Sequence, residues 1–274
     1  MPPTFWESVL LGAIQGAAEL LPISSSGHLA LWNVLFGVSS RALPLAVLLR
    51  LGTWLAALLV LRVRLRAALE GGFAALRRPS LFATAPGARD ALVMLLVAVP
   101  SGVTSWALRH AAERASQSPL AIGLGFLVTA LLLLGAHFAK PGRAEQPGVV
   151  GALLMGAAQG VAVLPGLSPL AVTLTLALLF GVRRERAFEL ALLVALPVTL
   201  GQLLFLSLGQ RPGPAALGLI GPAAVACVTA FLVGLLALWL LRRAVVSGRL
   251  SWFGAWLMPV SLATLALAKA WPHG

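Results

Sequence analysis

Polar and ionisable side chains interrupt two long apolar stretches, and the first interruption holds several groups capable of chemistry. Glu19 precedes Pro22, the serine run 24–26 follows, and His28 comes next. A carboxylate can bind a cation, a hydroxyl can attack an electrophile, and imidazole can act as an acid or a base. A helix starting after the proline would add free N–H groups that suit an anion, particularly phosphate. The spacing therefore predicts an anion site beside a carboxylate.

The second interruption offers a similar turn. Pro165, Gly166 and Ser168 break the stretch, and Thr173 lies one helical turn further on. Simpler explanations exist for single members of both groups, since serines are common N-caps and a lone His28 could be a satisfied interfacial histidine. The gathering of Glu19, three serines and His28 within ten residues favours a functional cluster.

Composition places both turns in a membrane protein. The chain has 274 residues, of which 59% are hydrophobic and only 10% are charged. A soluble domain of this length could not be solvated by so few charges. The formal charge of +12 indicates membrane topology rather than nucleic-acid binding, because the basic residues lie in short loops between apolar runs. A single cysteine, Cys227, excludes an internal disulfide framework.

The apolar stretches are of two kinds. Six are long and uninterrupted enough to span a bilayer as helices. They cover residues 43–62, 91–108, 119–138, 187–208, 216–241 and 252–271. The other two, 5–37 and 149–181, are broken in the middle, which lipid tolerates only where protein or water satisfies the freed backbone. The predicted fold class is an all-α polytopic membrane protein with six spans and two re-entrant helix-turn-helix hairpins.

The basic residues predict an orientation. If only the six spans cross, one side holds the loops 62–90, 139–148, 182–186 and 242–250, with fourteen of the twenty basic residues. The positive-inside rule assigns that side to the cytoplasm. If both hairpins crossed as well, the four basic loops would still lie on one common side. The charges therefore do not separate the two topologies, and the mid-segment breaks favour the re-entrant interpretation.

The two broken stretches also resemble each other. GAIQGAAELLPISSS (12–26) aligns with GAAQGVAVLPGLSPL (156–170) at an offset of 144, and one deletion aligns Pro22 with Pro165. Three spans follow each hairpin, so the second half would be inverted. We expect one membrane domain over 1–274, built from inverted repeats at 1–138 and 149–274, with the site at their interface near the bilayer midplane.

Two further ionisable residues need an explanation. Arg50 lies within a predicted span, where it must snorkel, pair with a carboxylate such as Glu19, or bind a ligand anion. Glu189 closely follows the basic run 183–186 and could form a surface ion pair there or serve the site.

Three motifs together resemble the undecaprenyl-diphosphatase family, the membrane enzymes linked to bacitracin resistance. They are ELLPISSSGHL (19–29), LPGLSPLAVT (164–173) and FELALLVALP (188–197). The resemblance extends almost end to end and implies hydrolysis of undecaprenyl diphosphate, with a divalent cation, Mg²⁺ or Ca²⁺, at a site open to the outer side of a bacterial inner membrane. Glu189 matches a family glutamate. Two positions depart: Gln15 replaces the first motif glutamate, and Pro169, followed by Leu170, replaces the second-turn arginine.

The resulting site has three parts. The catalytic residues are expected to be Glu19, Ser24, Ser25, Ser26 and His28, with Glu19 also the metal ligand. The substrate-binding residues are expected to be Gln15, Gly27, Gly166, Ser168, Thr173 and Arg50, the last as a replacement for the missing arginine. The expected partners are the polyprenyl diphosphate and the membrane, with no nucleic acid, and a homodimer is compatible. The alternative is a catalytically impaired homologue that binds or translocates a polyprenyl phosphate; a purely structural subunit fits less well.

Overall fold

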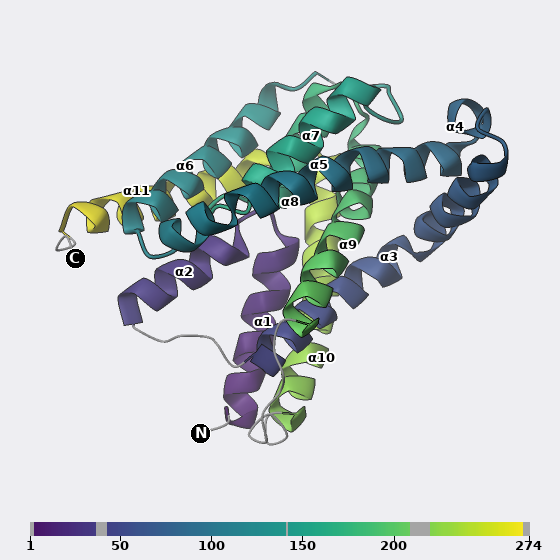
Figure 1. Cartoon of the computed structure of the whole chain (residues 1–274). Coiled ribbons are helices and arrows are strands. Elements are labelled where there is room, and N and C mark those ends of the chain that lie inside the picture. The colour runs from purple at the N-terminus through teal and green to yellow at the C-terminus, as the bar shows by residue number, and fades with distance from the viewer. Residues whose placement is uncertain (1–2, 37–42, 141, 209–219, 271–274) are drawn as a thin grey trace.

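The computed structural model describes residues 3–36, 43–140, 142–208 and 220–270, and this part of the chain is helical with no named strand (Figure 1). The elements are α1 (Phe5–Leu20), α2 (Ser25–Phe36), α3 (Leu43–Arg77), α4 (Leu81–Thr84), α5 (Pro86–Ala115), α6 (Pro119–Gly135), the 3₁₀ turn η1 (Ala136–Phe138), α7 (Val149–Val161), α8 (Pro169–Leu179), α9 (Arg184–Leu208), α10 (Ile220–Val246) and α11 (Ser251–Ala270). The predicted all-α class is confirmed.

Five of these helices are long and apolar enough to cross a membrane. They are α5, α6 with η1, α9, α10 and α11, which match five of the six predicted spans. The sixth, 43–62, lies in α3, where the first four side chains fall outside the described residues and the helix continues to Arg77. Residues 37, 216–219 and 271 of the predicted elements also lie outside the described residues. The length and apolar composition of these helices indicate a multi-pass membrane protein.

The two broken stretches form helix pairs, as predicted. α1 and α2 have 16 and 12 residues, and α7 and α8 have 13 and 11. At 1.5 Å per residue, each is shorter than the roughly 20 residues needed to cross the hydrocarbon. Pro22 and Pro165 lie in the connecting turns, where the missing N–H and restricted φ end a helix.

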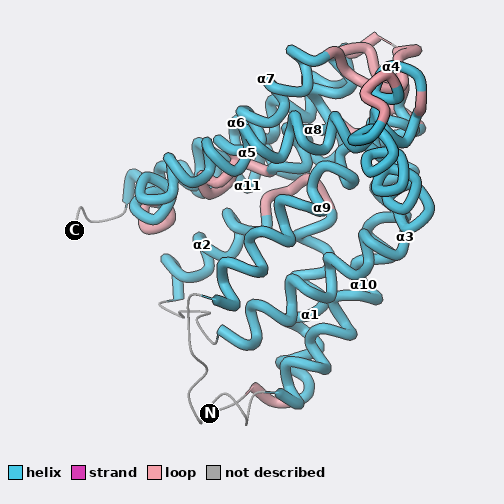
Figure 2. The backbone as a smooth tube through the Cα atoms, turned by 45° about the vertical axis from the view of Figure 1, so that its right-hand side comes forward, coloured by secondary structure: helices cyan, strands magenta, loops and turns pink. Residues whose placement is uncertain are grey.

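The pairs are held by different neighbours. α1 packs against α10, α7 packs against α5, and α6 packs against α11, while α3 lies between α10 and α5 (Figures 1 and 2). α8 is buried along nearly its whole length, which fits its apolar sequence, because a helix that is apolar on all sides belongs in an interior. The second turn is therefore held by the packed core.

The four basic loops meet at one end of the molecule, as the topology predicts. A short parallel bridge joins Ala144 to Val182, and the guanidinium of Arg184 packs over Gly248. Arg64, within α3, donates to Glu189 of α9 at 3.1 Å, which adds the start of the 62–90 segment to this cluster. The four basic segments are therefore in contact with one another or with the start of α9.

Candidate functional site

The first turn positions its serines through an unusual backbone. Ser24 has φ +64°, in the left-handed region that non-glycine residues adopt infrequently. Its hydroxyl accepts from the N–H of Gly27 at 3.2 Å, and its carbonyl accepts from the N–H of His28 at 3.2 Å. Ser24 therefore acts as the N-cap of α2, which confirms the simpler explanation for this serine. The first N–H groups of the helix, those of Ser25 and Ser26, have no partner in the helix itself.

Glu19 lies directly beside this helix start. The hydroxyl of Ser25 donates to its Oε2 at 2.6 Å, and the side-chain N–H of Gln15 donates to the same oxygen at 3.3 Å. Gln15 is buried one turn earlier on α1. The predicted neighbours Gln15, Glu19 and Ser25 are thus in contact, and a hydroxyl hydrogen-bonded to a carboxylate is an arrangement that can raise its nucleophilicity.

His28 lies on the far side of the serines. Its Nδ1 is 2.9 Å from the carbonyl oxygen of Ser24, and its ring packs edge-on against Phe126 at 4.8 Å between centroids. A carbonyl can only accept, so Nδ1 carries the proton and Nε2 holds the lone pair in the neutral ring. His28 is therefore oriented as a base through Nε2. Ser26 is within 3.4 Å of Ser24, hydroxyl to hydroxyl.

The second turn is held by a residue that the sequence reasoning missed. Thr129 of α6 donates its hydroxyl to the carbonyl of Gly166 at 2.7 Å and accepts from the N–H of Ser168 at 3.1 Å. Gly166 has φ +86°, and Ser168 caps α8 by accepting from Ala171 N–H at 3.2 Å. Thr129 had no distinguishing signal, because it lies within an apolar span where threonine usually bonds to its own helix.

The two turns are in contact. The hydroxyl of Ser24 donates to the carbonyl of Leu167 at 3.1 Å, across 143 positions of sequence. A Cβ on Gly27 would lie 2.6 Å from the Cα of Gly166, which leaves no space for any side chain there. The expected meeting of the two broken segments is therefore observed, and the glycines at 27 and 166 make it sterically feasible.

This close approach predicts that Gly27→Ala disrupts the contact between the turns. The new methyl would meet backbone atoms of Gly166 at 2.6–2.7 Å, and backbone cannot rotate away as a side chain can. Overpacking of this kind costs roughly 1–3 kcal/mol. Thermal unfolding in detergent should show a clear loss of stability. Gly102→Ala, where a Cβ meets nothing within 4 Å, is the matched control and should not destabilise. Equal behaviour of the two variants would contradict the close packing.

Two predicted residues do not join the cluster. The hydroxyl of Thr173 is buried and lies within reach of the carbonyls of Pro169 and Leu170, 2.9 and 3.2 Å away in its own helix. Arg50 donates to the side-chain oxygen of Gln202 on α9 at 3.2 Å rather than pairing with Glu19. The option of a Glu19 ion pair is wrong, because α9 supplies a neutral acceptor that satisfies the guanidinium.

Glu189 belongs to an ion-pair network at the other end of α9. It accepts from Arg64 and from Arg186, both at 3.1 Å, so the predicted pairing with the basic run is present. The network centres on Arg186 and Asp90, which contact each other and are almost fully buried. Both residues fall in predicted loops, 62–90 and 182–186; the position of Asp90 just before an apolar span was the available signal.

Loop charges extend the network outward. Arg183 forms an ion pair with Glu145, and this hydrogen bond holds the pKa of the Glu145 carboxyl below its usual value. The nearby positive charges of Arg186 and Arg64 act in the same direction. Glu145 therefore remains ionised at neutral pH and ties the 139–148 loop to the start of α9.

The side-chain oxygen atoms around Glu19 suit a divalent cation that also binds a substrate. Within the described residues no three Asp, Glu, His or Cys side chains gather into a metal-binding group. Mg²⁺ commonly needs only one or two carboxylates when substrate phosphates and waters complete its shell. Glu19 supplies the carboxylate, and because Gln15 donates through its nitrogen, its amide oxygen can still serve as a ligand.

Comparison with known proteins gives one consistent result. Residues 8–263 match the family described as bacitracin resistance protein BacA. The chain is 34% identical over 266 residues to an undecaprenyl-diphosphatase from Korarchaeum cryptofilum, covering 95% of this chain and 98% of the relative. It is 34% identical over 268 residues to one from Desulfatibacillum aliphaticivorans, covering 92% and 95%. A third, from Desulforapulum autotrophicum, is 32% identical over 269 residues, covering 95% and 97%. The chain therefore belongs to the bacitracin resistance protein BacA family.

Proposed function

We propose that this protein hydrolyses undecaprenyl diphosphate to undecaprenyl phosphate and inorganic phosphate. The observation that carries the proposal is the 2.6 Å hydrogen bond from Ser25 to Glu19 at the start of α2. It joins a nucleophile, a carboxylate and free helix N–H groups within one turn. The relatives named undecaprenyl-diphosphatase support this substrate class.

The residues divide the chemistry among them. The terminal phosphoryl group would lie against the N–H groups of Ser25 and Ser26, where the positive end of the α2 dipole favours anions. A hydroxyl, from Ser25 or from a water, would attack phosphorus while the bond to the bridging oxygen breaks and the lipid monophosphate leaves. Attack by water gives inorganic phosphate directly. Attack by Ser25 leaves the phosphoryl group on the serine oxygen, and a water would then attack phosphorus, release inorganic phosphate and restore the hydroxyl. Glu19 or the Nε2 of His28 would accept the hydroxyl proton. Ser24 is less suited to attack, because its hydroxyl is buried and committed to Gly27 and Leu167.

A divalent cation, Mg²⁺ or Ca²⁺, is part of this proposal. Glu19, with the amide oxygen of Gln15, would hold it. Bound there, the cation would neutralise charge on the diphosphate oxygens. The chain's own residues would still bind the phosphoryl group, orient it and accept the proton.

The second turn favours one alternative, a relative that binds or carries a polyprenyl phosphate without cleaving it. Pro169 occupies N1 of α8, so it provides neither a guanidinium nor an N–H donor. A planar guanidinium stabilises transferring phosphoryl groups, and its loss would weaken transition-state stabilisation more than ground-state binding. A catalytically impaired homologue is what such a substitution would produce.

Arg50 is the candidate replacement for this lost charge. Among the residues that the structure describes, Arg50 donates to neutral Gln202 and forms no ion pair, so the guanidinium could turn to an anion. We predict that Arg50→Gln lowers phosphate release at least tenfold, because charged hydrogen bonds are worth about 1.5–3 kcal/mol. Gln202→Ala is the matched control and should retain activity. Full activity of Arg50→Gln would remove Arg50 from the site.

We further infer inverted repeats over 1–138 and 149–274 within one membrane domain, with both turns near the bilayer midplane as re-entrant hairpins. Glycine packing supports this. Cβ atoms on Gly12 and Gly16 would meet the carbonyls of residues 226 and 230 of α10, and on Gly156 and Gly160 those of residues 97 and 101 of α5. In both repeats, two glycines four residues apart on the first short helix approach two carbonyls four residues apart on a long helix. The N-caps Ser24 and Ser168 also keep the offset of 144, without the deletion that the prolines require.

Orientation follows from the basic end of the molecule. If that end faces the cytoplasm, the first turn enters from the opposite face, so the site would open to the outer side of a bacterial inner membrane. The partners proposed are the lipid diphosphate and the bilayer, without nucleic acid; a homodimer is compatible with this arrangement.

The test of function is direct. The purified protein is incubated in detergent with undecaprenyl diphosphate, with Mg²⁺, with Ca²⁺, or with a chelator, and released phosphate is measured. Metal-dependent release supports the hydrolase. Saturable binding of the lipid without release supports the carrier, and neither binding nor release contradicts both.

A further inference from the structure

The far half of α3 carries an exposed face that the proposed function does not use. Beyond the predicted span, α3 and the start of α5 run together as a hairpin closed by α4 (Figure 1). The hairpin is held from inside by small residues: Ala68, Ala75 and Ala88 are fully buried, and a Cβ on Gly71 would lie 2.4 Å from the Ala88 nitrogen. The opposite side of α3 faces outward.

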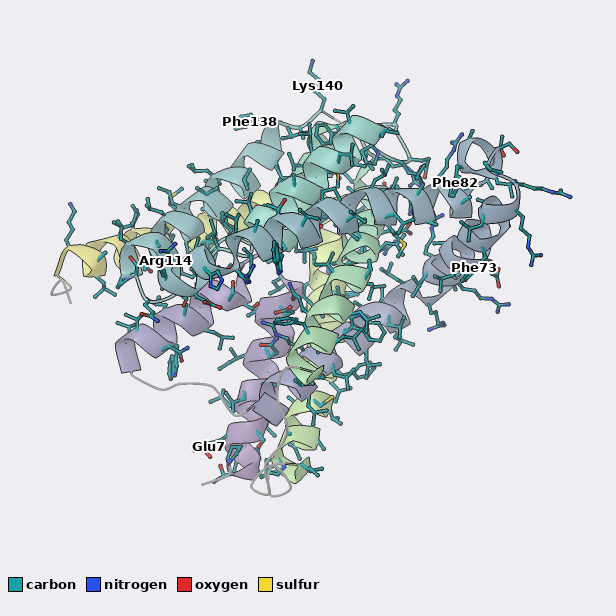
Figure 3. The ribbon with its side chains drawn as sticks, in the orientation of Figure 1. Glu7, Phe73, Phe82, Arg114, Phe138 and Lys140 are labelled. Atoms are coloured by element: carbon teal, nitrogen blue, oxygen red, sulfur yellow. The ribbon has the colours of Figure 1, made fainter. Side chains whose placement is uncertain are left out.

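That outward side combines arginines with large apolar side chains. Arg62, Arg66, Leu69, Phe73 and Leu76 are spaced by four, three, four and three residues, which puts them on one helix face. We call these five residues the α3 outer face. Phe73 and Leu76 are 70% and 73% exposed, and with Arg77 they line a surface hollow. Figure 3 shows Phe73 on the side of α3 away from α5.

Charge identifies the partner class. Residues 62–89 contain six arginines and one acidic residue, Glu70, which pairs with Arg66 at 2.7 Å. Two copies of this face would bring like charges together, which disfavours self-association. Apolar side chains interspersed with arginines match the interface of an anionic bilayer, where the apolar groups enter the acyl boundary and the guanidinium groups reach phosphates.

We propose that the α3 outer face docks the α3–α5 hairpin onto an anionic lipid surface. The hairpin then lies along the interface of the bilayer that the other helices span. Leu69, Phe73 and Leu76 enter the headgroup boundary, while Arg62, Arg66 and Arg77 contact lipid phosphates. This role is separate from the hydrolysis proposed at the two turns, and the following test does not depend on activity.

The experiment measures the depth of a nitroxide in nanodiscs. The label is placed at Phe73→Cys, with Leu69→Cys as a second position, in a Cys227→Ala background. Ser247→Cys, exposed in the turn after α10 at the same end, is the aqueous control. Depth is read by comparing relaxation by oxygen with relaxation by a water-soluble nickel chelate. The nanodiscs contain either phosphatidylcholine alone or an equimolar mixture with phosphatidylglycerol.

In the anionic nanodiscs both α3 labels should lie roughly 5–10 Å below the phosphates, while position 247 stays in water. In phosphatidylcholine, and in the Arg66→Gln/Arg77→Gln variant, the α3 labels should shift toward water. Nickel access at position 73 equal to that at 247 in both lipids would overturn the proposal. Equal depth of the α3 labels in both lipids would overturn the charge dependence of the proposed docking. Spin–spin broadening between labels would overturn the lipid proposal and indicate contact between two copies of the protein instead.

Discussion

Glu19→Gln is expected to lower phosphate release from undecaprenyl diphosphate by on the order of a hundredfold or more. Glutamine keeps the size of the side chain and can still accept from Ser25, but it carries no negative charge and is not a base. Loss of general-base catalysis alone typically costs 10²–10⁴-fold, and weaker cation binding would add to it. The measurement is the initial rate of phosphate release at saturating lipid and metal.

Glu113→Gln provides the matched control, because this carboxylate is exposed on α5 and, among the described residues, forms its one ion pair with His110. It should retain the activity of the unchanged protein. Both variants should also keep the same melting temperature in detergent, which separates lost chemistry from lost structure. Retention of most activity by Glu19→Gln would remove the carboxylate from the mechanism.

Arg186→Met is expected to destabilise the protein by about 3–5 kcal/mol, the largest structural effect that we predict. The change leaves the carboxylate of Asp90 without its closest positive charge, although Asp90 is only 1% exposed. Arg64 approaches Asp90 only to 3.9 Å and is itself bound to Glu189. The free energy of unfolding, measured by denaturant titration in detergent, should fall accordingly.

Arg183→Met is the control, since in its ion pair with Glu145 both side chains are partly exposed to solvent, at 38% and 58%. Such pairs typically contribute 0–1 kcal/mol, so this variant should stay close to the unchanged protein. The double variant Arg186→Met/Asp90→Leu removes both buried charges and should recover part of the lost stability. A double variant less stable than Arg186→Met would contradict the account of an unpaired charge.

Local signals were sufficient for the elements of the fold. Proline, glycine and serine in the middle of apolar stretches predicted where α1 and α7 end, because these effects act within a few residues. The approach of Glu19 and Ser25 was also predictable, since both flank one short turn. Long apolar runs predicted five of the spans for the same reason.

Contacts between distant helices were not predictable in this way. Thr129 reaches the second turn from the middle of α6, and nothing in its neighbourhood distinguishes it from a span residue. Arg50 was expected to snorkel, to pair with a carboxylate or to bind an anion, and its neighbour Gln202 on α9 was not foreseen. Asp90 and Arg186 resemble loop charges until the packing of α5 against α9 buries them. Each case depends on which helices pack against each other, and the residues close by in the sequence do not determine this.

The proposed hydrolysis depends on binding of the terminal phosphoryl group at the start of α2, beside Glu19. The most direct measurement is a structure of the protein with Mg²⁺ and a methylene-bridged analogue of undecaprenyl diphosphate, which cannot be cleaved at the bridge. We expect the terminal phosphonate within hydrogen-bond reach of the Ser25 and Ser26 N–H groups, with the cation between it and Glu19. An analogue bound away from both turns, for example at the basic end near Arg186, would contradict it.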